Sequence, residues 1–94
     1  MSFLYTLEGI IRDRQVNPVE GSYTNSLFAS GRGRMAQKVG EEGVETVIAA
    51  LTQDRERQTS EIADLFYHTL VLMADLGLTL EDIEAELQRR HAPR

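Results

Sequence analysis

The 94-residue sequence contains no cysteine and no apolar run that approaches the roughly 20 residues a membrane-spanning helix needs. The absence of cysteine excludes disulfides and thiolate metal sites, and it fits a reducing compartment. The first residues, MSFLYTLEGIIRDR, include Glu8 and lack the long apolar segment of a signal peptide. We therefore expect a cytoplasmic protein that neither crosses nor binds a membrane.

Basic residues are also scarce, with 10 Lys and Arg against 15 Asp and Glu and a formal net charge of -5. Nucleic-acid binding usually requires a basic surface, so we expect no nucleic-acid partner. The length predicts a single domain over residues 1–94. Because so short a chain buries only a modest core, we expect a homodimer that completes the core or the active site.

Apolar periodicity predicts an all-α fold of four to five helices and no strand. The expected helices cover residues 3–14, a segment that resumes near 27 and becomes a long helix from about 34 to 52, then about 57–76 and 80–90. Pro18 and Gly21 predict one long loop over residues 15–26. Together these features favour a helical bundle completed by homodimerisation.

The helix ends and faces are also predicted. Gly77 should end the helix predicted over about 57–76, and Thr79 with an acid three residues later resembles a capping box that starts the last helix. In the long helix, the apolar stripe consists of Met35, Val39, Val47 and Leu51, with Ala36, Val44 and Ile48 beside it. In the last helix we expect Leu80, Ile83 and Leu87 to face inward.

Charged side chains gather on one flank of the long helix. At about 100° per residue, Glu41, Glu42 and Glu45 share this flank with Arg34 and Lys38, which lie one to two turns toward the N-terminus. Like charges three or four residues apart cost a helix roughly 0.2–0.5 kcal/mol per pair. Such crowding indicates either an ordinary solvated surface or a bound cation.

The next helix repeats the pattern, with Glu61 and Asp64 three residues apart and His68 one turn further on. Acidic residues are rarely buried without partners, so an acid pair in a largely apolar helix is informative. If the two helices form an antiparallel hairpin, the carboxylates converge between them. For His68, the simplest interpretation is a helix histidine bonded to a nearby carboxylate.

Oxygen-only clusters suit a hard divalent cation, so we predict Mg²⁺, with Mn²⁺ as an alternative. Such an ion would also reconcile an acidic protein with an anionic ligand, because it can bridge carboxylates and a polyphosphate. Arg34 and Lys38 are then candidates for phosphate contacts. The ion could orient and activate a water for attack at phosphorus.

The spacing E-E-x-x-E, 15 residues, E-x-x-D, formed by Glu41, Glu42, Glu45, Glu61 and Asp64, resembles the signature of the all-α nucleoside triphosphate pyrophosphohydrolases, the MazG-like superfamily. The segments GSYTNSLFASG, KVGEEGVETVIAA and EIADLFYHTLVLM look like the phosphoribosyl-ATP pyrophosphatase family of histidine biosynthesis. The resemblance extends from Leu4 to about Arg90.

This resemblance implies Mg²⁺-dependent hydrolysis of phosphoribosyl-ATP to phosphoribosyl-AMP and pyrophosphate, the second step of histidine biosynthesis, by a cytoplasmic homodimer. It also implies roles for individual residues. The metal-binding acids would be Glu42, Glu45, Glu61 and Asp64, with Glu41, Glu42 and Glu45 as the catalytic set, in which Glu41 binds metal or positions water. Near the substrate the resemblance places Ser22, Tyr23 and Thr24 of the SYT segment, together with His68.

Two alternatives share these residues. A general house-cleaning pyrophosphohydrolase would use the same acids on ordinary or damaged nucleoside triphosphates. A non-catalytic dimerisation module would carry the acidic face only for solubility, and its melting temperature would not rise with Mg²⁺.

Overall fold

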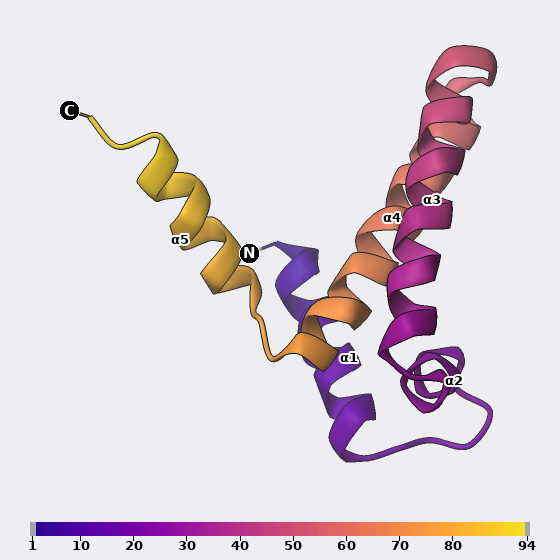
Figure 1. Cartoon of the computed structure of the whole chain (residues 1–94), viewed down its shortest axis with the longest axis vertical. Helices are drawn as coiled ribbons and strands as arrows, with labels where there is room; N and C mark the ends of the chain where they lie inside the picture. Colours follow the sequence, from indigo (N-terminus) through magenta and orange to yellow (C-terminus); the bar gives the residue numbers. More distant parts are fainter. Residues whose placement is uncertain (1, 94) are drawn as a thin grey trace.

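The computed structural model describes residues 2–93, and within them it contains five α-helices and no strand. The helices are α1 (Phe3–Val16), α2 (Tyr23–Ser30), α3 (Arg32–Thr52), α4 (Arg55–Leu76) and α5 (Leu80–Arg90). Helices α3 and α4 form a long antiparallel hairpin, α1 and α2 pack at its open end, and α5 projects to the other side (Figure 1). The all-α prediction is confirmed.

Capping residues fix the ends of α4 and α5. The Asp54 carboxylate accepts a hydrogen bond from the amide of Arg57 (3.0 Å), so α4 begins at Arg55, two residues earlier than the periodicity predicts. Gly77 ends α4 with a left-handed φ of 76°, which glycine adopts without steric cost. Thr79 and Asp82 form the predicted reciprocal capping box, with hydrogen bonds of 3.1 and 2.9 Å.

The long loop expected over residues 15–26 is wrong, because α2 already begins at Tyr23. The hydroxyl of Ser22 caps this helix by accepting from the amide of Asn25 (3.2 Å). The Asn25 side chain also accepts from the amide of Val19 (2.8 Å) and donates to the carbonyl of Arg14 (2.7 Å). The polar residues that suggested a loop therefore stabilise a helix start, and the loop covers only 17–22.

The hydrophobic core lies where α1, α2, the start of α3 and the end of α4 meet. Its buried members are Ile11, Leu27, Met35, Leu70, Val71 and Met73. The other end of the α3–α4 hairpin extends beyond this core (Figure 1). The C-terminal end of α4 is thus anchored by apolar packing, while the acidic segment of the hairpin lies nearer the α3–α4 turn.

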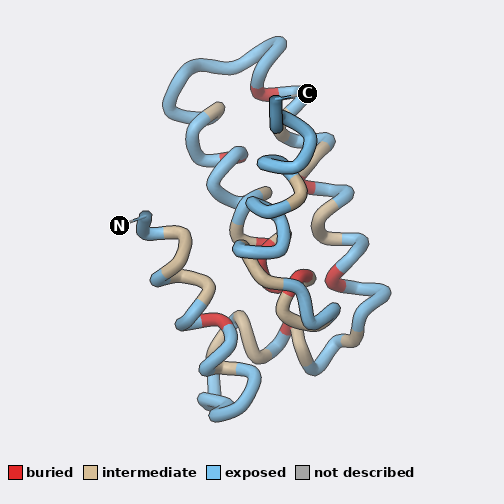
Figure 2. Tube along the Cα trace, turned by 90° about the vertical axis from the view of Figure 1, so that its left-hand side faces the viewer, coloured by how far each residue is buried: buried red, intermediate tan, exposed pale blue. Residues whose placement is uncertain are grey.

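Much apolar surface stays exposed, which corrects the expected packing. The side chains of Val44, Val47, Ile48 and Leu51, hereafter the α3 apolar face, are all exposed. Helix α5 contributes no buried residue within 2–93 (Figure 2). Leu80 packs against the core as predicted, whereas Ile83 and Leu87 are exposed. The chain exposes 6631 Å², against about 5,500 Å² expected for a compact monomer of this size. Its radius of gyration is 14.8 Å, against about 12 Å expected.

Over the described residues, no single helix is long and apolar enough to cross a membrane. Helices α4 and α5 meet that length and composition only together, as a pair bent by 102° at their junction.

Candidate active site

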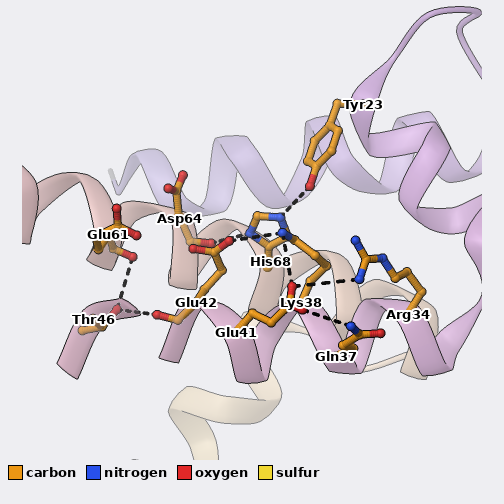
Figure 3. Close-up of polar contacts among 10 residues, drawn as sticks. All are labelled: Tyr23, Arg34, Gln37, Lys38, Glu41, Glu42, Thr46, Glu61, Asp64 and His68. Atoms are coloured by element: carbon orange, nitrogen blue, oxygen red, sulfur yellow. Dashed lines mark hydrogen bonds and ion pairs between the residues drawn. The ribbon is translucent and has the colours of Figure 1, made fainter. Parts of the chain in front are cut away.

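The α3–α4 hairpin brings three carboxylates together. One oxygen from each of Glu42, Glu45 and Glu61 lies within 4.8 Å of the other two. Thr46 sets the two helices at this level, because its hydroxyl lies 2.8 Å from the carbonyl of Glu42 and 3.4 Å from that of Glu61 (Figure 3). The hairpin therefore brings the acidic motif of α3 close to that of α4, as expected if the two helices run antiparallel.

Two of these acids are buried in an unusual way. Glu42 is 6% exposed and Glu61 is 4% exposed, and each is paired with a basic side chain through its Oε1 atom only. Within residues 2–93 no donor reaches Glu42 Oε2 or Glu61 Oε2. A buried carboxylate oxygen without a partner is energetically costly. Among the described residues, the cluster therefore contains two unsatisfied hydrogen-bond acceptors.

The charges of the cluster repel one another. Glu61 raises the pKa of Glu45, because a hydrogen bond between the two carboxyl groups requires one of them to be protonated and because the negative charge of Glu61 opposes ionisation of Glu45. Glu45 is exposed whereas its two companions are buried. A cation placed among the three would remove this repulsion.

Basic side chains line the side of the cluster nearer the start of α3. Lys38 Nζ lies 3.4 Å from Glu42 Oε1 and 3.6 Å from Glu41 Oε1, and Arg34 Nη1 lies 3.9 Å from Glu41 Oε1. Desolvation opposes the charge of Lys38, but Tyr23, Glu42 and Glu41 together raise the pKa of this lysine. Lys38 therefore keeps a positive charge beside the acids.

Glu41 differs from the three clustered acids. Its carboxylate accepts a hydrogen bond of 3.0 Å from Gln37, which lowers the pKa of Glu41 together with the charges of Lys38 and Arg34 (Figure 3). Its side chain remains about half exposed. Glu41 therefore stays ionised and holds the two basic side chains in place.

The donor set fits a divalent cation of the Mg²⁺ type. All three converging groups are carboxylates, which are the hard oxygen ligands that Mg²⁺ and Mn²⁺ prefer. The two unpaired oxygens of Glu42 and Glu61 would gain ligand bonds in place of their missing hydrogen bonds. The chemistry of these residues therefore suits such a cation, and its binding stays a prediction.

Asp64 is the one predicted ligand that lies outside this group. Its side chain is exposed, and Figure 3 shows its carboxylate directed away from that of Glu42. Its position three residues after Glu61 puts the two side chains on neighbouring parts of one helical surface. Its role as a ligand stays a prediction.

Two side chains of the SYT segment are hydrogen-bonded to aromatic side chains of α4. His68, which is buried, has its Nδ1 2.7 Å from the carbonyl of Asp64, so this nitrogen carries the hydrogen. His68 Nε2 then accepts from the hydroxyl of Tyr23 (3.0 Å; Figure 3). Thr24 Oγ1 is hydrogen-bonded to the hydroxyl of Tyr67. These side chains therefore fix α2 against the helix that carries Glu61.

Replacing Tyr23 with phenylalanine tests this connection. Tyr23→Phe leaves the buried acceptor His68 Nε2 without its donor, so we expect a loss of about 1–3 kcal/mol in the free energy of unfolding. Tyr5→Phe is the matched control, since Tyr5 donates to Glu84 at the surface, which raises the pKa of Tyr5 to about 12. Chemical denaturation of both variants decides, and equal losses would contradict the structural role of the Tyr23 hydroxyl.

Comparison with known proteins agrees with this geometry. Residues 4–91 match the family model described as phosphoribosyl-ATP pyrophosphohydrolase. The chain belongs to the phosphoribosyl-ATP pyrophosphohydrolase family. The resemblance carried by the acidic motif and the SYT segment is thereby confirmed.

Relatives of this family occur in two lengths. A protein of Metallosphaera sedula named phosphoribosyl-ATP pyrophosphatase is 53% identical over 87 residues, which cover 93% of this chain and 94% of the relative. The histidine biosynthesis bifunctional protein HisIE of Escherichia coli is 52% identical over 95% of this chain and 44% of its own length. The bifunctional protein of Oceanobacillus iheyensis is 50% identical over 89% of this chain and 39% of its own length. This chain thus spans about two fifths of the bifunctional relatives.

For this pyrophosphohydrolase family member, sequence reasoning missed Arg57. Its Nη2 lies 2.6 Å from Glu61 Oε1, so a basic side chain also lies on the other side of the acid cluster. The i, i+4 spacing of Arg57 and Glu61 is a recognisable pairing signal. Because it is also the spacing of ordinary surface ion pairs, the spacing alone does not mark Arg57 as part of a site.

Proposed function

We propose that this chain hydrolyses phosphoribosyl-ATP to phosphoribosyl-AMP and pyrophosphate in the second step of histidine biosynthesis, in the cytoplasm and with Mg²⁺. The observation that carries the proposal is the convergence of Glu42, Glu45 and Glu61 with two buried, unpaired carboxylate oxygens. The end-to-end likeness to a relative named phosphoribosyl-ATP pyrophosphatase supports the choice of substrate.

The acids would hold the cation and the basic residues would hold the phosphates. Glu42, Glu45 and Glu61 are the ligands on this chain, with Asp64 as a fourth that reaches the ion by a side-chain rotation. Bound Mg²⁺ supplies positive charge that neutralises the polyphosphate and favours in-line attack of water at phosphorus. Lys38 and Arg34 donate to phosphate oxygens, and Glu41 keeps these two side chains oriented.

The reaction breaks the bond between the bridging oxygen and the α-phosphorus, while a water oxygen forms the new bond and its proton must be taken up. Glu41 lies outside the set of acids that would hold the cation and is exposed, so we assign to it the positioning of this water and the uptake of its proton. The basic side chains beside the cluster would balance the charge of the departing pyrophosphate, with further positive charge from the cation when it is bound.

A substrate comparison tests the proposed function. Pyrophosphate release is measured with Mg²⁺ for phosphoribosyl-ATP and for a panel of ordinary nucleoside triphosphates. We expect kcat/KM for phosphoribosyl-ATP to exceed the others by about a hundredfold or more, since a site built for an extra polar group rejects ligands that lack it. Equal values would indicate the general house-cleaning enzyme, and hydrolysis of none of them would contradict the proposal.

The pH dependence of Mg²⁺ binding follows from the raised pKa of Glu45. A metal ligand must lose its proton, so the apparent affinity should fall by about tenfold per pH unit once the pH drops below that pKa. Calorimetric titrations between about pH 7 and about pH 4 measure it. Glu45→Gln should bind weakly with a flatter profile, and a wild-type affinity that stays constant over this range would contradict the ligand role of Glu45.

We also propose that a second copy of the chain covers the α3 apolar face. The extra exposed area and the large radius of gyration support this, because both exceed the values for a compact monomer. An open groove of about 840 Å³ lies on α3 alone, lined by Gln37, Gly40, Glu41, Val44, Glu45 and Ile48. Since Glu41 and Glu45 border this groove, a partner chain seated there would form a wall of the active site.

A further inference from the structure

A small polar pocket lies on the far side of the acid cluster from Lys38. Its volume is about 220 Å³, and its lining consists of Glu45, Ile48, Gln53, Arg57 and Glu61. Two of the three clustered acids therefore form one wall, and the residues at the α3–α4 turn form the other. Any anion that shares a cation with Glu45 and Glu61 would have this space beside it.

Arg57 is poised for such an anion. Among the described residues its guanidinium makes one side-chain hydrogen bond, the 2.6 Å contact with Glu61 Oε1, although an arginine offers five N–H donors. The Arg57 side chain is 58% exposed, while that of Glu61 is buried. The exposed Arg57 side chain is free to turn toward solvent, but it can leave the buried Glu61 only if another cation takes up the charge of that carboxylate.

A cation at the cluster and Arg57 compete for the same carboxylate. Glu61 Oε1 faces Arg57, and Glu61 Oε2 is buried without a partner. When a divalent ion takes up the charge of Glu61, the attraction that holds Arg57 falls and the like charge of the ion repels it. Arginine then has a strong alternative partner in a phosphate group, which matches its planar fork of donors.

We propose that this pocket is the subsite for pyrophosphate and that Arg57 exchanges Glu61 for a phosphate oxygen of that group. The inference rests on the proposed function and adds to it the orientation in which the substrate binds across the acid cluster. On the other side of the cluster Lys38 is paired with Glu42, and Tyr23, which raises the pKa of this lysine, lines an open cleft of about 990 Å³ beside the 17–22 loop. A space of about 220 Å³ fits a pyrophosphate group better than a nucleoside with its attached ribose, so the small pocket receives the leaving end.

Direct binding of inorganic pyrophosphate tests the subsite. Isothermal titration calorimetry with saturating Mg²⁺ compares wild type, Arg57→Gln and Arg55→Gln, the last being a matched control two residues away on the same helix with an exposed side chain. We expect Arg57→Gln to weaken pyrophosphate binding by about tenfold or more and Arg55→Gln to leave it unchanged. Binding of AMP should change in neither variant.

The outcomes separate Arg57 from the wider proposal. Equal pyrophosphate affinity in the two variants would overturn the subsite, as would an equal loss for AMP. If Arg57 only neutralises Glu61, Arg57→Gln should instead tighten Mg²⁺ binding and leave pyrophosphate affinity unaltered. Arg57→Lys keeps the charge and decides the matter if the glutamine variant does not fold, since an unchanged affinity there also overturns the assignment. A wild-type protein that binds pyrophosphate but does not hydrolyse phosphoribosyl-ATP would contradict the proposed function alone.

Discussion

Glu45→Gln is expected to lower hydrolysis by about a hundredfold or more while it raises the melting temperature of the metal-free protein. The loss of activity follows because charge stabilisation by a bound cation is worth several kcal/mol, and each 1.36 kcal/mol changes a rate tenfold. The gain in stability follows because the glutamine removes one of three converging negative charges. The two effects have opposite signs, which distinguishes a functional acid from a structural one.

The sign of the stability change comes from the pKa of Glu45. Because the pKa is raised in the folded chain, the contact with Glu61 stabilises the fold only below that value, where Glu45 is protonated. As the pH rises through the raised pKa this stabilisation is lost, so near pH 7 the ionised pair destabilises the metal-free protein. Saturating Mg²⁺ should raise the melting temperature of wild type and have little effect on Glu45→Gln.

Glu81→Gln is the matched control for Glu45→Gln, since it removes the same formal charge from an exposed position on α5. We expect it to leave turnover and the response to Mg²⁺ unchanged. Thermal scans with and without Mg²⁺ and steady-state assays measure both properties. Near-normal turnover in Glu45→Gln, with wild-type Mg²⁺ stabilisation, would remove Glu45 from the site.

Val47→Glu should break the proposed dimer. Val47 lies in the middle of the α3 apolar face and is 58% exposed in the single chain. A carboxylate forced into an apolar contact without a partner costs several kcal/mol, so the dissociation constant should rise by about a hundredfold or more. Hydrolysis should fall as well, because Glu41 and Glu45 border the surface that the second chain would cover.

Val16→Glu controls for the added charge, as Val16 is also exposed but lies at the end of α1. Sedimentation equilibrium over a range of protein concentrations measures association for wild type and both variants. We expect only Val47→Glu to shift toward monomer. A wild-type protein that is monomeric at assay concentrations, or a Val47→Glu variant that associates normally, would contradict the dimer.

Sequence patterns predict local structure correctly at positions where a residue type strongly favours one conformation. Gly77 and the pair Thr79 and Asp82 mark the end of α4 and the start of α5 as expected, because a left-handed glycine and a capping box depend on neighbours in sequence alone. For the SYT segment the sequence wrongly predicts a loop, and the reason is the opposite one. Ser22 and Asn25 suit both loops and helix caps, and the decision depends on contacts with Arg14 and Val19.

Burial was harder to predict than helicity. Apolar periodicity shows which face of a helix is apolar, but it does not show which neighbour covers that face. Leu51 and Leu87 lie on the expected stripes and are exposed, because the single chain provides no helix to pack on them. The same reasoning did succeed for Met35, which lies at the start of α3 against the core.

For the candidate site, the sequence predicts which side chains share a helix face, but not the direction of each side chain. Helical spacing and the antiparallel hairpin placed Glu42, Glu45 and Glu61 together, since both depend on regular geometry. Spacing could not indicate the side-chain direction of Asp64 or the partner of Arg57, because rotamers and ion pairs are chosen by tertiary surroundings.

The most direct test of the account is an anomalous difference map from crystals grown with Mn²⁺, which has the same preference for oxygen ligands as Mg²⁺. The account predicts a peak at about 2.1 Å from carboxylate oxygens of Glu42, Glu45 and Glu61, contributed by both helices of the hairpin. A map without a peak at this cluster, or with Mn²⁺ bound only elsewhere, would contradict the claim that these acids form a metal centre.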